Sequence, residues 1–418
     1  MTIDIDNLNR SIGPGTVAEP RIQIGKLALF AIFLAMFFGA ITFRAIHHDT
    51  SIYSEFGFHI EKSQAMAREG RILEPHFLFH VLTIAAHDVI TLGRAADSEP
   101  TPSPEVFDSW AAAALIVITA AYAATTLLLY SALRRIKASV NGSITLAFCL
   151  SIVAPLFLLA PIDGWYYLGY LSPSTIYIIP TQVLLKLTTL ALFLLTCRAM
   201  KDRLGAPTYI LLALLVVANG LAKPNYLIIM GPALITLAAM EFSKGRPLDM
   251  RLVAASILPA IAVLAWQYHF KFVNTHGLIY ESSIILTTPF EVWGHHSDYV
   301  PLKFLLSSAF PIYVAVAYWN RLKADISLKF AWLLYFYGLL FTAFVAESGF
   351  ARYAGNFVWS GQIANFVLFV ASALTFFSID RTGQATTKHR YAVGVAILSL
   401  HVLAGLFYYF RNFIYAFR

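Results

Sequence analysis

A carboxylate and an imidazole stand one helical turn apart in the segment SEFGFHIEKSQAMAREG, residues 54–70. Glu55 and His59 are four residues apart, so a helix places both side chains on one face. Ser54 is predicted to cap the start of this helix and Gly70 to end it. Such a pair suits acid–base catalysis at a membrane surface, where a low dielectric shifts both pKa values towards neutrality. The plainer alternative is a solvated polar face on an interfacial helix.

Histidines repeat this spacing in EPHFLFHVL, residues 74–82. His76 and His80 are four residues apart, and His87 extends the same helical face. Two histidines at this spacing can bind a metal ion, but no carboxylate or thiolate completes the ligand set at a familiar spacing. We therefore predict no metal site and interpret these side chains as the polar lining of a substrate groove.

Two lysines stand within or between apolar runs. Lys186 lies well inside the run 177–197, where a lysine is costly unless it is paired, reaches the interface or lines a polar cavity. Lys223 lies in GLAKPNY, residues 220–226, at a turn between two apolar runs. Both are candidates to bind an anionic group, and snorkelling to the interface is the alternative for Lys186.

Polar residues also gather in ESGFARYAGNFVWSG, residues 347–361, between two apolar runs. The segment contains Glu347, Arg352, Asn356 and Trp359. A guanidinium suits a phosphate and an indole suits a sugar ring. Trp359 taken alone is more typical of the aromatic belt of a membrane protein. The segment HHSDY, residues 295–299, adds two histidines and an aspartate, for which an ordinary polar loop is the alternative.

The elements that position these residues are membrane helices. The chain is 58% hydrophobic and 13% charged, with a mean hydropathy of +0.67, whereas soluble domains carry roughly 25% charge. We therefore exclude a soluble globular protein and predict an all-α, polytopic membrane protein with a single transmembrane domain over 1–418. The first apolar run is expected to be a span, not a cleavable signal. About eleven spans are predicted, near 26–43, 109–130, 143–162, 177–197, 207–221, 226–240, 252–270, 304–319, 330–346, 362–378 and 391–410.

Alternating basic connections predict the orientation of the spans. Three Lys or Arg residues occur in the N-terminal segment and in each of the connections 134–137, 198–203, 243–251, 320–329 and 381–390. The positive-inside rule puts these on the cytoplasmic side. The formal charge of +7 then indicates contact with anionic lipid, and no nucleic-acid partner is expected. On the external side we predict a long loop, 44–108, with two interfacial helices, and smaller loops at 271–303 and 346–362.

In its order of motifs the chain resembles the C-type glycosyltransferase superfamily. These polytopic enzymes have a long external loop with an acidic motif and membrane-parallel helices after the first span. The similar segments are EFGFHI, EPHFLFHVL, YLGYLSPSTIYIIPT, AKPNY and ESGFARYAGNFVW. The family usually has an aspartate where this chain has Glu55. Other branches place the acid directly after the first span, where this chain has Asp49. The base is therefore either Glu55, which we favour, or Asp49.

The resemblance implies transfer of a sugar from a polyprenyl-phosphate carrier to a hydroxyl of a cell-envelope lipid, glycan or protein. The reaction is expected to invert the anomeric carbon and to need no cofactor. It would take place on the periplasmic or exterior face of a bacterial inner membrane. Lys186, Lys223 and Arg352 are candidates to stabilise the leaving phosphate. His59 or His76 would orient the acceptor or bind the phosphate, and His80, Glu347, Asn356 and Trp359 would line the substrate site.

Three alternatives stay open. A transporter for a lipid-linked sugar predicts functional charges near the bilayer midplane and repeat symmetry, whereas these charges cluster near one predicted face. An O-antigen polymerase or ligase would use Arg and His in a late loop, such as residues 295–299 or Arg352. A non-catalytic scaffold in a cell-envelope complex would still bind its partners after the carboxylates are neutralised. The sugar and the acceptor are not predicted.

Overall fold

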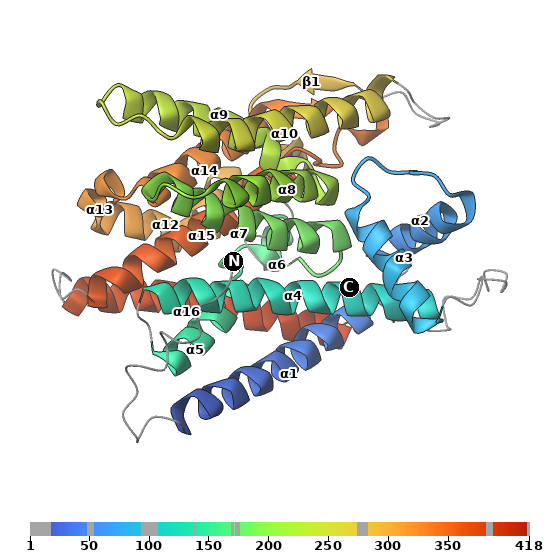
Figure 1. The fold of residues 1–418 in the computed structure, drawn as a ribbon, viewed down its shortest axis with the longest axis horizontal. Coiled ribbons are helices and arrows are strands. Elements are labelled where there is room, and N and C mark those ends of the chain that lie inside the picture. Colours follow the sequence, from blue (N-terminus) through green and yellow to red (C-terminus); the bar gives the residue numbers. More distant parts are fainter. Residues whose placement is uncertain are drawn as a thin grey trace.

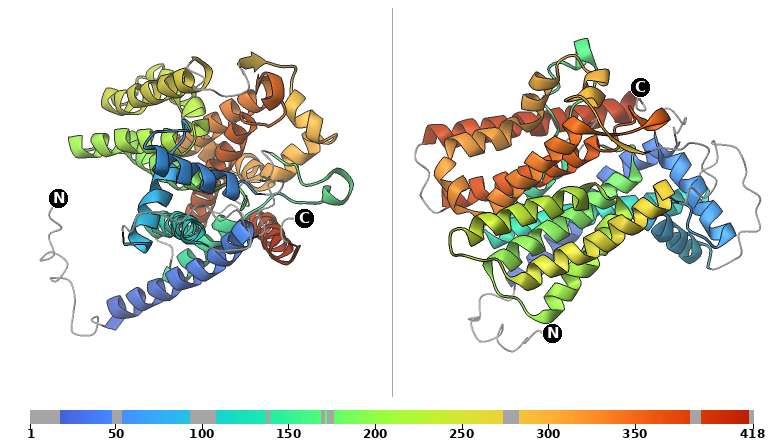
Figure 2. Two further views of the ribbon diagram at one scale, coloured as in Figure 1. Left: turned by 90° about the vertical axis from the view of Figure 1, so that its right-hand side faces the viewer. Right: turned by 90° about the horizontal axis from the view of Figure 1, so that it is seen from above.

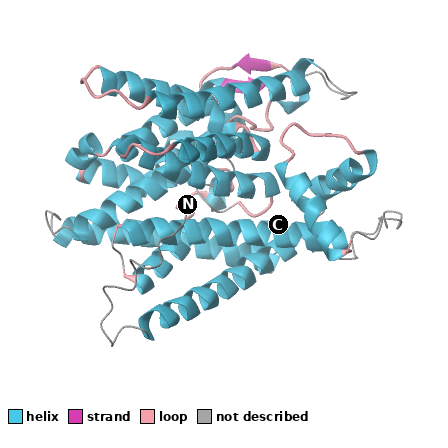
Figure 3. Ribbon diagram, viewed as in Figure 1, coloured by secondary structure: helices cyan, strands magenta, loops and turns pink. Residues whose placement is uncertain are grey.

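The computed structural model describes residues 18–47, 54–92, 108–136, 139–168, 171, 176–273, 283–381 and 388–415. Asp49, together with Gly169, Ser172 and Pro173 of the third similar segment, lies outside the described residues. Helices account for most of the described chain, as Figure 3 shows. The prediction of an all-α polytopic membrane protein is confirmed at that level.

Nine helices within the described ranges are long and apolar enough to cross a membrane. The shorter helices α5 (Val140–Ile152) and α8 (Ala206–Ala222) fall at two further predicted spans, so the exact number of spans stays a prediction. The nine are α1 (Ala18–His47), α4 (Ser109–Arg135), α7 (Pro180–Lys201), α9 (Asn225–Phe242), α10 (Met250–Tyr268), α12 (Val300–Ala317), α14 (Ile326–Phe344), α15 (Val358–Arg381) and α16 (Lys388–Tyr415).

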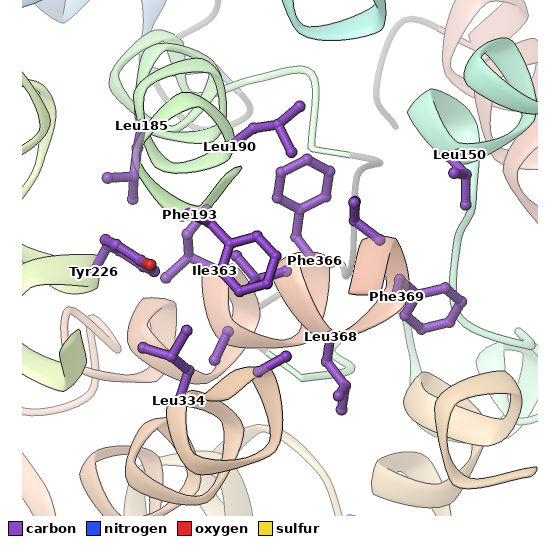
Figure 4. Close-up of a cluster of buried hydrophobic side chains, with 14 of the residues drawn as sticks. Leu150, Leu185, Leu190, Phe193, Tyr226, Leu334, Ile363, Phe366, Leu368 and Phe369 are labelled. Atoms are coloured by element: carbon purple, nitrogen blue, oxygen red, sulfur yellow. The ribbon is translucent and has the colours of Figure 1, made fainter. Parts of the chain in front are cut away.

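Helix α15 forms the centre of the bundle. In its most apolar stretch 89% of the residues are buried, so nearly every face of this helix contacts protein. Figure 4 shows Ile363 and Phe366 of α15 near Phe193 of α7 and Leu334 of α14. At Gly338 of α14 a side chain would overlap the backbone of α15, and such small residues let membrane helices approach closely.

One predicted span is not a single helix. The expected span 143–162 contains α5, which ends at Ile152, then non-helical backbone and the four-residue α6 (Ala160–Asp163). Pro155 cannot donate a backbone hydrogen bond, which explains the break. The Ala154 N–H instead donates to the His401 carbonyl of α16 at 3.1 Å, and the Leu156 N–H to the Leu306 carbonyl of α12 at 3.1 Å. Non-helical backbone at membrane depth is tolerated only where such partners exist.

Between α1 and α4 lie α2 (Phe56–Glu69) and α3 (Leu78–Ile90), at one end of the bundle in Figures 1 and 2. That they lie in a membrane interface stays a prediction. The loops near 271–303 and 346–362 meet in an antiparallel pair of strands, β1 (Ile284–Leu286) and β2 (Val345–Glu347), which pairs Ile284 with Glu347. Short elements complete the fold: a π-helix (His269–Val273), a 3-10 helix (Gly349–Ala351), α11 (Glu291–His296) and α13 (Trp319–Ala324).

Candidate functional site

The start of α2 fixes the position of Glu55. The Ser54 hydroxyl accepts a hydrogen bond from the Phe56 N–H at 3.2 Å, and the Glu55 N–H donates to the Ile178 carbonyl at 2.9 Å. The helix ends at Gly70, whose φ of 62° is left-handed, as the sequence predicts. Glu55 is therefore tied to the segment that leads into α7, 123 residues later in the chain.

Glu55, His59 and His80 form a chain of polar contacts. The His59 Nε2 lies 3.6 Å from a Glu55 carboxylate oxygen, and the His59 Nδ1 lies 3.1 Å from the His80 Nε2. Both histidines are buried, whereas the Glu55 side chain is 51% exposed. The carboxylate is thus open to a substrate while the two rings behind it are held by packing.

The protonation state of His80 determines the direction of the hydrogen bonds between Glu55, His59 and His80. Burial, helped by the positive charge of Lys62, lowers the pKa of His80 to about 3. His80 is therefore neutral at physiological pH and carries one ring proton. Its Nδ1 is buried without a hydrogen-bond partner among the described residues; an unpaired N–H there would be costly, so the proton sits on Nε2. His80 then donates to His59, whose Nε2–H points at Glu55.

Lys223 supplies a positive charge within electrostatic range of Glu55. It ends α8 in an extended conformation (φ −171°, ψ 140°), which the following Pro224 favours. Its Nζ lies 5.0 Å from the centre of the Trp359 ring. Burial lowers the pKa of Lys223; the nearby Glu55 charge raises it and Lys271 lowers it, and the net change is downward.

The same charge acts on the carboxyl group. Burial raises the pKa of Glu55, but contact with the His59 ring N–H and the positive charge of Lys223 outweigh burial, so the pKa lies below its ordinary value. Glu55 is therefore ionised at neutral pH, as a general base must be before it accepts a proton.

A second group of polar residues lies around Glu347. The Lys271 Nζ contacts the Glu347 Oε1 at 2.5 Å, and the Asn356 side chain donates to the same oxygen at 2.9 Å. Asn225, at the start of α9, donates to the Asn356 carbonyl at 2.7 Å. These bonds hold the loop before α15 against the ends of α9 and α10.

His76 connects the two groups. Burial first, and then the positive charges of Lys223 and Lys271, lower the pKa of His76 well below its ordinary value. Its charge environment therefore includes members of both groups. The segment before it is anchored by Gln267 of α10, whose amide donates to the Pro75 carbonyl at 2.9 Å and to the Gly220 carbonyl at 2.8 Å.

Two predicted phosphate ligands have contacts outside this cluster. Lys186 is buried in α7, where it lines a small cavity with Tyr122 and Thr126, and its Nζ has no hydrogen-bond partner among the described residues. Arg352 contacts the Glu291 carboxylate at 2.6 Å. No hydrogen bond or ion pair between described residues joins either cation to Glu55 or Lys223.

Three positioning residues are missed by the sequence analysis: Asn225, Gln267 and Lys271. Lys271 has a readable signal, because it is a charge at the outer end of a predicted span. Asn225 and Gln267 have none, since their partners are 131 and 192 residues away. No cluster of three or more metal-binding side chains occurs within the described ranges.

The arrangement combines an ionised, half-open carboxylate with a cation and an aromatic ring. Trp359 is buried against Ile176 and Ile179, so it belongs to the cluster and not to a lipid-facing belt. No protein-family model matches the chain, and no curated protein matches it in sequence.

Proposed function

We propose that the protein is a membrane glycosyltransferase that moves a sugar from a polyprenyl-phosphate carrier to an acceptor hydroxyl. The observation that carries this proposal is that Lys223 lies within electrostatic range of Glu55 at one end of a membrane bundle. A base and a cation within electrostatic reach of each other match the two charges that such a transfer develops. The order of sequence motifs supports the same class of reaction.

In the proposed step Glu55 accepts the proton of the acceptor hydroxyl. The hydroxyl oxygen forms a bond to the anomeric carbon, and the bond between that carbon and the phosphate oxygen breaks. The carrier phosphate leaves with the electron pair and so gains a negative charge. Lys223 stabilises that charge, because its ammonium group has no hydrogen-bond acceptor among the described residues. Attack from the face opposite to the phosphate inverts the anomeric carbon.

The remaining residues position these two groups. His59 and His80 orient the carboxylate, and neutral His76 is available to hydrogen-bond the acceptor or the phosphate. Trp359 offers an aromatic face for the sugar beside Lys223. The reaction needs no cofactor in this scheme, and the acceptor is a lipid, glycan or protein of the cell envelope. The motif resemblance implies a bacterial inner membrane, and the basic connections favour Glu55 on the periplasmic or exterior side.

The test is transfer from a labelled polyprenyl-phosphate sugar in proteoliposomes. The Glu55→Gln variant should lose roughly 10²- to 10⁴-fold of the rate, the usual contribution of a general base. Glu61→Gln, a change of an exposed carboxylate on the same helix, is the matched control and should keep full activity. Asp49→Asn tests the other candidate base. Full transfer by both Glu55→Gln and Asp49→Asn would show that the mechanism is wrong.

One observation favours a transporter of a lipid-linked sugar as a second candidate. Lys186 is a buried charge inside a predicted span and has no hydrogen-bond partner among the described residues. Such residues often mark substrate or ion pathways. Movement of a fluorescent lipid-linked sugar across proteoliposomes, lost in Lys186→Met but kept in Glu55→Gln, would support transport instead of transfer.

A further inference from the structure

A cavity of about 660 Å³ lies at the end of the bundle opposite to Glu55. It is formed by the last turns of α4 and α7, the first turn of α14 and the later part of α15. Helix α7 runs from Pro180, next to the segment that holds Glu55, to Lys201 at the cavity. Its 22 residues span roughly 30 Å, which is the thickness of a bilayer core. The two sites are therefore on opposite sides of the bundle.

Three cations, Arg135, Arg198 and Lys201, line the cavity with two carboxylates, Asp202 and Asp325, so the lining carries a net charge of +1. Lys201 pairs with Asp325 at 3.3 Å. Asp325 also accepts hydrogen bonds from the Ser327 N–H at 2.9 Å and the Thr375 hydroxyl at 3.4 Å, so its charge is already engaged. Arg135 and Arg198 also line the cavity; both are exposed, and neither forms a salt bridge with a carboxylate of the described chain.

The deeper wall is apolar. Phe193 and Leu194 of α7 and Ala371 and Leu374 of α15 line it. Ser327, whose buried hydroxyl lies beside the Cys197 thiol, also lines the cavity. The cavity thus offers two guanidinium groups and an apolar surface.

We propose that this cavity binds an anionic phospholipid. The phosphate contacts Arg135 and Arg198, because planar guanidinium groups pair well with phosphate oxygens. An acyl chain lies along the apolar wall, which a small hydrophilic anion would leave uncovered. Basic pockets between membrane helices attract anionic head groups in the cytoplasmic leaflet, and the basic connections predict that this end faces the cytoplasm. The inference does not depend on the proposed function.

Binding of phosphatidylglycerol to the purified protein in nonionic detergent tests this site. Native mass spectrometry should show phosphatidylglycerol bound more tightly than phosphatidylcholine, and glycerol 3-phosphate should not compete for the site. The double variant Arg135→Gln, Arg198→Gln should bind phosphatidylglycerol roughly tenfold or more weakly, given the usual contribution of each basic residue near an anionic surface. Each single variant should show part of that loss. If the double variant does not fold, the phosphatidylglycerol affinities of the two single variants test the site.

Arg251→Gln is the matched control. Arg251 is an exposed arginine at the start of α10, on the same basic side but outside the cavity lining, and its loss should leave the affinity unchanged. Equal binding of both lipids by the unaltered protein would overturn the proposal. So would competition by glycerol 3-phosphate alone, or wild-type affinity in the double variant.

Discussion

Two buried lysines near the Glu55 end of the bundle have opposite surroundings. Lys303 of α12 is fully buried, and its Nζ contacts the Asp163 carboxylate at 2.8 Å and the carbonyls of Asp163, Gly164 and Tyr166 at 2.7 to 3.1 Å. Lys223 is also buried, but among the described residues its ammonium group has only the Trp359 ring and the more distant Glu55 charge.

The contrast separates a structural lysine from one that is ready for a ligand. A buried ammonium is stable when acceptors replace its water. Lys303 has its acceptors from the chain itself and ties α12 to the loop after α6. Lys223 lacks them, so an anion that enters beside Glu55 gains a partner at no cost to the fold. The proposed phosphate site follows from that difference.

The largest expected effect is on stability, at Lys303. Lys303→Met leaves the Asp163 carboxylate without its main partner, and breaking a buried pair in this way costs about 3–5 kcal/mol. Thermal unfolding in detergent measures the loss. Adding Asp163→Asn to Lys303→Met should recover part of the stability, because the uncompensated charge is then removed. An unchanged melting temperature in Lys303→Met would contradict the structural role of Lys303.

The next effect is on transfer, at Lys223. Lys223→Met should reduce the rate roughly 10²- to 10³-fold, the usual cost of losing one group that stabilises transition-state charge. The melting temperature should stay close to that of the unaltered protein, since no hydrogen bond of the described chain is lost. Rate and melting temperature measured on the same preparation make the comparison. A Lys223→Met variant with a clearly lower melting temperature but a normal transfer rate would show that Lys223 is a structural lysine.

The smallest effect is on the pH profile. Glu55 acts when ionised, so the rate rises as pH increases through its pKa, which lies below 4.5. Lys223 acts when protonated, so the rate falls as pH increases through its pKa, which lies below 10.5, by about tenfold per unit. Lys223→Arg should remove this alkaline decline, because a guanidinium stays charged. A decline that persists unchanged in Lys223→Arg would assign it to another group.

Local patterns in the sequence predicted the parts of the molecule that depend on neighbouring residues. Glu55 and His59 lie on one face because residues four positions apart are about one helical turn apart. Gly70 ends that helix as predicted. The contact of Lys271 with Glu347 joins residues 76 positions apart, and no local pattern encodes it. No local pattern encodes the β1–β2 pair either, since the two loops meet only after the helices between them pack.

The prediction of one continuous helix over 143–162 was wrong for a different reason. Its hydropathy is that of a span, and hydropathy does not register that Pro155 lacks an N–H. The sequence also could not predict the contacts of Lys186 and Arg352. The small cavity around Lys186 and the pairing of Arg352 with Glu291 depend on the packing of α7 and of α11.

The broken helix after α5 has a consequence for how the protein is made. The Ala154 carbonyl accepts from the His401 ring at 2.6 Å, and those residues are 247 positions apart. A ribosome adds roughly 5–20 residues each second, so the partner of this backbone group is synthesised some tens of seconds later. Through that interval the segment cannot rest in lipid as an ordinary span does. It must wait in contact with water or with the insertion machinery until α16 is made, so a helix synthesised late completes one synthesised early.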